Sequence, residues 1–200
     1  QLNVLHKDST LPVYQTNVVF LVPKMDGDMI GRQFIYSILD KRPKRANVYW
    51  FVNVVVTDEP FTKEFEVDMM DTDFVVKLKL YLGFRVNQEV NVYIRQIIHD
   101  LMKQGRLKKQ YQKYSITPGR EVGDFQFILI KEALSNNTEL SKWDRQIMQA
   151  KLFIKKYTMS PESWFGLEYS DVKYETVPLT IGKIKKTRLV ERKPNVGEKF

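Results

Sequence analysis

Apolar residues in the first third of the chain form two short runs and one helical stripe. Residues 17–22 are apolar and rich in β-branched side chains, and Pro23 closes them, as expected for a buried strand. An acidic cap at residues 26–28 then precedes an apolar stripe at helical spacing, formed by Ile30, Phe34 and Ile38. This helix should end before Pro43, because the residue before a proline avoids the α region.

The next run, residues 47–57, is apolar without clean alternation. A strand of this kind lies in the centre of a sheet that is covered on both faces. Together with the strand and the helix before it, this run predicts a βαβ unit with a right-handed parallel crossover.

Residues 64–69 and 76–82 alternate between apolar and polar side chains, which predicts an antiparallel hairpin with one solvated face. If the pairing of the two strands slipped by one residue, every leucine would face solvent, so burial of the apolar face fixes the register. With the turn at residues 70–73, the expected pairs are Val67 with Val76, Phe65 with Leu78, Glu66 with Lys77 and Glu64 with Lys79.

The second half continues with helices and strands. A helix opening at residues 87–89 should end near Gly105, and its apolar stripe is Val90, Ile94, Ile97, Ile98 and Leu101. We expect a strand over 124–130, a helix after Ser141, a short helical turn from Pro161 to Gly166, and a strand over 172–181 that Pro178 restricts to a sheet edge. The fold class is therefore α/β: a mixed sheet with a parallel βαβ core, an antiparallel hairpin and helices packed on the sheet.

The composition is that of a folded domain. The 43% hydrophobic and 12% aromatic fractions exclude a disordered chain. No apolar stretch approaches the roughly 20 residues of a membrane helix. With no Cys and two His, disulfides, thiol nucleophiles, thiolate zinc sites and a three-His zinc site are excluded. The chain starts with Gln1 rather than Met, so we expect a piece of a longer or processed protein.

The net charge of +8 is concentrated in a few segments. Residues 183–200 hold seven basic and two acidic residues, and basic clusters also occupy 41–45 and 103–120. We expect one globular domain over residues 1–182, with 1–14 as a loose linker, followed by a basic, flexible tail at 183–200. The basic clusters indicate a solvated surface, or a surface facing an anion or a membrane; nucleic acid is the weakest partner, because no helix-turn-helix or RRM pattern is present.

The sequence contains no pattern typical of catalysis. Neither His6 nor His99 has a Ser or carboxylate at a diagnostic spacing. There is no Walker A, G-x-G-x-x-G or H-E-x-x-H motif. We therefore expect a protein that is not an enzyme, with no catalytic residues, no metal ligands and no resident cofactor.

One family resemblance covers most of residues 5–181. The segment 35–46, with Val48-Tyr-Trp-Phe-Val52 and Asp58-Glu-Pro60 after it, closely resembles the C-terminal cytosolic domain of bacterial KUP-type (HAK/KUP/KT) potassium uptake proteins. The similarity continues through Tyr81-Leu-Gly-Phe-Arg85, Val90-Asn-Val-Tyr-Ile-Arg-Gln96, Gly123-Asp-Phe125 and Trp164-Phe-Gly-Leu167.

The resemblance implies a parent membrane protein that imports K⁺ together with H⁺, with K⁺ handled by a transmembrane region outside this sequence. It places the domain at the cytoplasmic face of the bacterial plasma membrane, beside its own transmembrane domain and anionic inner-leaflet lipid. Related transporters pair their cytosolic domains as homodimers, and some bacterial members are inhibited by cyclic di-AMP. If this domain binds that dinucleotide, guanidinium and ammonium groups would contact the phosphates, and the candidates are Arg32, Arg42, Lys44 and Arg45.

The main hypothesis is therefore a regulatory and dimerisation domain of a potassium importer. The alternative is a freestanding nucleotide- or RNA-binding protein, which predicts salt-sensitive binding to oligonucleotides. For each of the four candidate residues, a solvated loop without a ligand remains an open interpretation.

Overall fold

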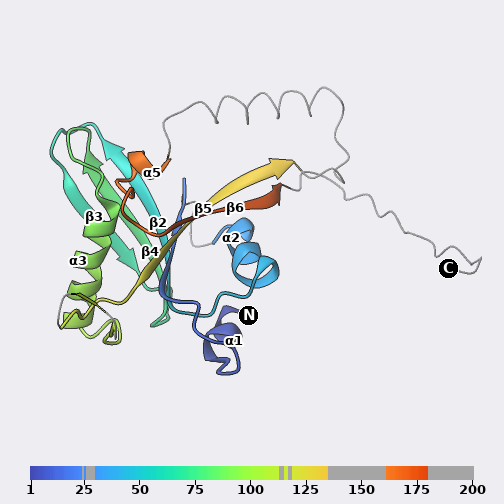
Figure 1. Cartoon of the computed structure of the whole chain (residues 1–200). Helices are drawn as coiled ribbons and strands as arrows, with labels where there is room; N and C mark the ends of the chain where they lie inside the picture. The colour runs from blue at the N-terminus through green and yellow to red at the C-terminus, as the bar shows by residue number, and fades with distance from the viewer. Residues whose placement is uncertain (24, 26–29, 113–114, 117–118, 135–160, 180–200) are drawn as a thin grey trace, which may run out of the picture. The chain divides into compact units, whose positions relative to one another are not determined.

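The computed structural model describes residues 1–23, 25, 30–112, 115–116, 119–134 and 161–179 (Figure 1). The chain divides into two compact units, one made of residues 1–132 and 158–177 and the other of residues 133–157 and 178–200. The first unit holds nearly all of the described residues. The predicted tail at 183–200 and the predicted helix after Ser141 lie outside the described residues.

The unit is built on a mixed six-stranded sheet with the order β3-β4-β2-β1-β5-β6. β1 pairs in parallel with β2 and β5, β2 pairs in parallel with β4, and β3 is antiparallel to β4. The predicted fold class and the parallel βαβ unit are thus confirmed, and β2 takes the expected central position. The strands are β1 (Gln15–Leu21), β2 (Ala46–Thr57), β3 (Lys63–Asp68), β4 (Val75–Gly83), β5 (Phe125–Leu134) and β6 (Val172–Leu179).

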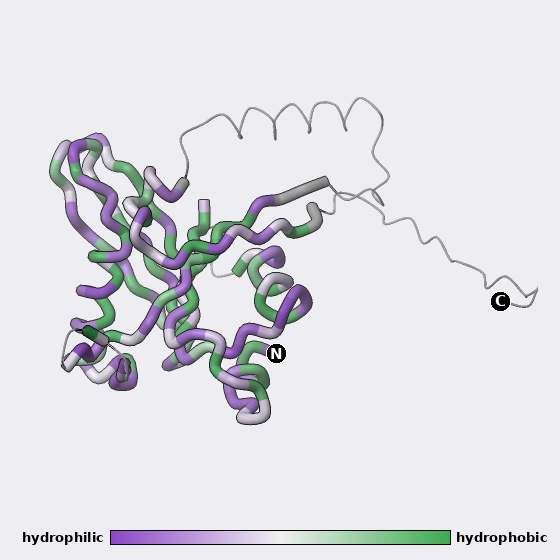
Figure 2. Tube along the Cα trace, in the orientation of Figure 1, coloured by the Kyte–Doolittle hydropathy of each residue, from purple (hydrophilic) through white to green (hydrophobic). Residues whose placement is uncertain are grey.

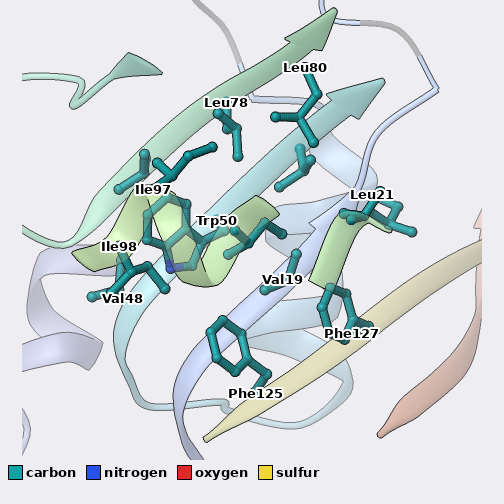
Figure 3. Close-up of a cluster of buried hydrophobic side chains, with 14 of the residues drawn as sticks. Val19, Leu21, Val48, Trp50, Leu78, Leu80, Ile97, Ile98, Phe125 and Phe127 are labelled. Atoms are coloured by element: carbon teal, nitrogen blue, oxygen red, sulfur yellow. The ribbon is translucent and has the colours of Figure 1, made fainter. Parts of the chain in front are cut away.

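Helix α3 (Val90–Lys103) covers one face of the sheet. All five residues of the predicted stripe are buried there, against side chains from β1, β2, β4 and β5. Trp50 lies among them, close to Ile97 and Ile98 (Figure 3). The helix ends as expected, since Gly105 adopts a left-handed φ of 69° and its N–H donates to the Met102 carbonyl.

The opposite face is covered by α1 (Leu2–Lys7), by α2 (Arg32–Tyr36) and by η1 (Ser37–Lys41), a π-helical turn that continues α2. Phe34 and Ile38 pack against the aromatic side chains of β1 and β2, as the apolar stripe predicted. Ile30, the first residue of that stripe, precedes the helix and is only partly buried. The predicted acidic cap at 26–28 lies outside the described residues.

The expectation of a loose linker at residues 1–14 is wrong for its first half. Leu5 of α1 is buried on the sheet, and the ring of His6 stacks on Phe74 with 4.2 Å between centroids. The Nδ1 atom of His6 lies 2.9 Å from the Ala46 carbonyl oxygen. These contacts hold a six-residue helix that is too short to form in isolation.

The hairpin forms with the expected alternation but in a different register (Figure 2 shows its alternating hydropathy). The predicted burial is wrong at two positions, since Phe65, expected on the core side, is 45% exposed, and Lys77, expected on the wet side, is buried. The loop takes two more residues than predicted, because Met70 and Asp71 adopt left-handed φ angles and the Thr72 N–H turns back to the Met69 carbonyl. A shift by two residues keeps every apolar side chain on the same face. The observed pairs are Val67 with Leu78, Phe65 with Leu80, Glu66 with Lys79, Glu64 with Tyr81 and Asp68 with Lys77.

The short helix α5 (Pro161–Trp164) and the edge strand β6 lie where the sequence predicted them. Gly166 ends the helical turn with a φ of 61°. A Cβ at this position would meet the Gln88 carbonyl oxygen at 2.7 Å, so the close approach to the start of α3 also requires glycine.

Candidate functional site

The four predicted phosphate ligands do not form one site. Arg32 and Arg42 are exposed and lie at opposite ends of α2–η1. Arg45 is half-buried, and its guanidinium donates to the carbonyl oxygens of His6 at 3.3 Å and of Leu11 at 2.8 Å. Lys44 is fully buried.

Lys44 and Arg45 therefore act inside the protein, contrary to the expectation of phosphate contacts from solvent. Arg45 fastens the segment that follows α1 to the start of β2. Lys44 has no access to a phosphate in solvent, and Arg32 and Arg42 are the accessible candidates.

The Lys44 ammonium forms an ion pair with Glu175 of β6 in the interior. Its Nζ lies 3.2 Å from Oε1 and 3.3 Å from Oε2, and the two side chains are 0% and 2% exposed. Nζ also donates to the carbonyl oxygens of Ser37 and Arg42. The Ser37 hydroxyl donates to Oε2 of Glu175 at 2.6 Å. Both charges thus have several partners, which is the condition under which a buried pair can persist.

The same cluster continues along the sheet to β1 and β5. Lys173 is a second cation on Glu175, with 3.1 Å from Nζ to Oε1, and it also donates to the Tyr14 hydroxyl at 3.5 Å. That hydroxyl donates to Gln126, whose amide donates to Asp171 at 2.8 Å. A chain of polar contacts therefore runs from the crossover, through β6, to the strands in the middle of the sheet.

The environment holds Glu175 ionised. Burial by itself would raise the pKa of its carboxyl, but hydrogen bonds from Ser37 and Lys173 and the charge of Lys44 lower it below the ordinary value of 4.5. Burial lowers the pKa of Lys44, against the attraction of Glu175. Lys173 keeps a raised pKa, because Glu175 and Tyr14 favour its charged form more than its partial burial disfavours it.

These contacts fasten the α2–η1 crossover to the edge strand β6. The π-helical turn places Ser37 and Lys44 beside Glu175, and Lys41 adds a bond from its ammonium to the Thr176 carbonyl at 2.8 Å. Single π turns of this kind are frequent at functional sites. These contacts join the crossover to β6 through three side chains, Ser37, Lys41 and Lys44.

Sequence reasoning missed Glu175, because its partner lies 131 residues away. One signal was present: Glu175 lies two residues before the buried Val177, so it shares the inward face of the strand. An inward acid predicts a buried cation but does not identify which one.

A second buried network fixes the loop after α3 to the core. The Asn17 and Gln110 amides donate to each other at 2.8 Å. The Trp50 indole donates to Asn17 at 3.1 Å, and the Gly123 N–H donates to Gln110 at 3.0 Å. Gln110, in the middle of the basic connection 103–120, is therefore fastened to Asn17 of β1 and to Gly123 just after the connection.

The described residues also line two open hollows. One, of about 650 Å³, lies between α1, the turn of the hairpin and Lys108. The other, of about 440 Å³, lies between the start of α3 and the segment 163–170. Among the described residues, no three His, Asp or Glu side chains gather in a way that could hold a metal ion, and no described helix has the length and apolar character needed to cross a membrane.

The comparisons with known proteins agree on one family. The family described as "K+ potassium transporter C-terminal domain" matches residues 15–184. The chain is 71% identical over 194 residues to the "Probable potassium transport system protein Kup" of Enterococcus faecalis, covering 96% of this chain and 29% of that protein. It is 54% identical over 198 residues to "Probable potassium transport system protein Kup 2" of Lactococcus lactis, covering 99% and 30%.

The Streptococcus pyogenes protein of serotype M18 with the name "Probable potassium transport system protein Kup" is 56% identical over 194 residues, covering 97% and 29%. No solved structure matches significantly. The chain thus spans about 30% of the length of the relatives that it matches, and the resemblance noted in the sequence is confirmed. The chain belongs to the family of C-terminal domains of KUP-type potassium transporters.

Proposed function

We propose that this chain is the cytosolic regulatory and dimerisation domain of a potassium importer, a K⁺/H⁺ symporter of the bacterial plasma membrane. The ion path would lie in the part of the transporter that this chain does not span. The observation that carries the proposal is the match of nearly the whole chain to the C-terminal part of proteins named for potassium transport.

The buried Lys44–Glu175 pair supports a regulatory role. A domain regulates a transporter by making different contacts in the states of that transporter. Because the pair joins the α2–η1 crossover to β6, a ligand or partner that displaces one element also displaces the other. The two accessible arginines, Arg32 and Arg42, flank the crossover helix, so an anion bound there would act on this connection.

We propose that cyclic di-AMP is the regulator and that Arg32 and Arg42 contact its phosphates. Arginine suits this role because a guanidinium pairs with phosphate through two parallel N–H bonds. Isothermal titration calorimetry of this chain at tens of micromolar tests the proposal. We expect heat on binding, and affinity about tenfold weaker for each arginine changed to Ala. The matched control is Arg85→Ala, an exposed arginine after β4 that should leave affinity unchanged. Absence of heat with the unmodified chain would overturn the ligand assignment.

Dimerisation is tested separately. Sedimentation equilibrium should give a mass of twice 23.7 kDa at high concentration, with dissociation on dilution. A mass of one chain at every concentration would contradict the dimer while leaving the calorimetry unaffected.

A further inference from the structure

The segment that follows α3 is held to the core and presents basic side chains outward. The N–H groups of Arg106 and Leu107 both donate to the Leu101 carbonyl, at 2.9 Å and 3.2 Å. Leu107 is buried in the core beneath the sheet, and Gln110 is buried in its bonds to Asn17. The loop is therefore held by two inward side chains, and the residues between and beside them point to solvent.

The outward residues of this loop combine positive charge with apolar tips. Lys103, Arg106, Lys108 and Lys109 are exposed, and residues 103–112 contain no acid. Tyr111 is 79% exposed, and Ile116, a little further along, is fully exposed. Isolated exposed apolar side chains are ordinary, but cations beside exposed aromatic and aliphatic tips are the pattern of a surface that meets a lipid interface.

Among the described residues, most of this charge has no acidic partner. Lys108 pairs with Asp73 of the hairpin turn at 2.6 Å. In the part of the chain that the structure describes, no ion pair involves Lys103, Arg106 or Lys109. The lining of the 650 Å³ hollow beside the loop is of mixed charge, because Asp68, Asp71 and Asp73 lie in it together with Lys7 and Lys108. The anion-attracting surface is the outward side of the loop.

Helix α1 lies at the same end of the unit (Figure 1). Asn3, His6 and Lys7 of α1 line the hollow together with Lys108. Val4 and Lys7 are exposed, so α1 adds another apolar and another basic side chain to this end. In the proposed function the membrane part precedes this helix, and the loop after α3 would then lie close to the membrane surface.

We propose that the outward side of residues 103–111, with Ile116 and the exposed residues of α1, binds the anionic phospholipid surface of the membrane. The cations would meet lipid phosphates, and Tyr111 and Ile116 would enter the headgroup region. This inference rests on the proposed function for its orientation, and on the loop geometry and charge for its chemistry.

Flotation of the chain with lipid vesicles tests the surface. Vesicles of phosphatidylcholine with one third phosphatidylglycerol should bind the chain, vesicles of phosphatidylcholine alone should bind it weakly, and high salt should release it. The variant Lys103→Gln/Arg106→Gln/Lys109→Gln should reduce the partition coefficient on the order of 100-fold, from about fivefold per cation. The matched control Lys63→Gln/Arg85→Gln/Lys131→Gln removes the same charge from exposed positions elsewhere and should lose much less.

A second variant separates lipid from other anions. Tyr111→Ser/Ile116→Ser should weaken vesicle binding several-fold at unchanged charge, with an unchanged melting temperature as the check on folding. The proposed lipid surface would be contradicted if the control variant and the loop variant lost vesicle binding equally. It would also be contradicted if the chain bound oligonucleotides but not vesicles. The calorimetric and sedimentation tests of the proposed function do not depend on these outcomes, so the two failures are distinguishable.

Discussion

Replacing Glu175 by Gln removes one charge from the buried pair and leaves the shape of the side chain almost unchanged. The Lys44 ammonium, which is 0% exposed, would then remain in the interior without a counter-charge. Removing one partner of a buried ion pair costs about 3–5 kcal/mol of unfolding free energy. For a chain of this length, that corresponds to a fall in melting temperature of roughly 6–20 °C.

Urea denaturation followed by circular dichroism measures this loss, with an unchanged slope m as evidence that the unfolded state is the same. The difference between the two proteins should also depend on pH. The folded pKa of Glu175 is lowered, so its contribution is complete above the ordinary carboxyl value of 4.5 and is lost as the pH falls through the lowered value. The unmodified chain and Glu175→Gln should therefore converge in acid.

Two controls isolate the buried charge. Lys173→Gln removes the other cation that contacts Glu175. Because the Lys173 side chain is 37% exposed, its loss should lower the free energy of unfolding by at most about 1 kcal/mol. The double change Lys44→Met/Glu175→Leu removes both buried charges and should be more stable than Glu175→Gln alone. A free energy of unfolding for Glu175→Gln within about 1 kcal/mol of that of the unmodified chain at neutral pH would show that the buried charge is not needed for stability.

Three further changes test other parts of the structure by the same denaturation assay. Gly166→Ala should lower the free energy of unfolding more than Gly105→Ala does. Both glycines have a positive φ, but only a Cβ at position 166 would meet another atom, a carbonyl oxygen at 2.7 Å. Equal costs would contradict this. Leu78→Ala should cost about 2–5 kcal/mol, because the side chain is fully buried under α3, and a cost under 1 kcal/mol would show that the core is placed wrongly. Asn17→Leu should cost about 1–3 kcal/mol through the unpaired indole of Trp50, with a red shift of tryptophan fluorescence expected if water reaches the ring; an unchanged stability would contradict the network.

Local patterns predicted the elements whose burial is set by their own periodicity. The five-residue stripe of α3 was correct because a helix that packs on a sheet buries one continuous face. The central position of β2 followed from its apolar run, and the edge position of β6 followed from Pro178, since a proline cannot donate to a sheet.

The errors arose where contacts distant in sequence decide the outcome. The hairpin register depends on the left-handed backbone of Met70 and Asp71. The sequence did not reveal this conformation, because neither residue is a glycine or asparagine, the usual signals of it. Lys44 resembles its neighbours in a basic loop, and only the fold brings it to Glu175. Helix α1 is stabilised by the contacts of His6 with Phe74 and Ala46, and the sequence of residues 2–7 alone does not predict a helix.

In the proposed function, this domain regulates transport, and the ions pass through the part of the transporter that this chain does not span. The most direct test is uptake of Rb⁺ into proteoliposomes by the full transporter and by a version that ends before residue 1 of this chain, each with and without cyclic di-AMP. The account predicts that both proteins take up Rb⁺ and that the dinucleotide inhibits only the full transporter. Equal inhibition of both proteins, or a correctly inserted shortened protein that takes up no Rb⁺, would contradict it.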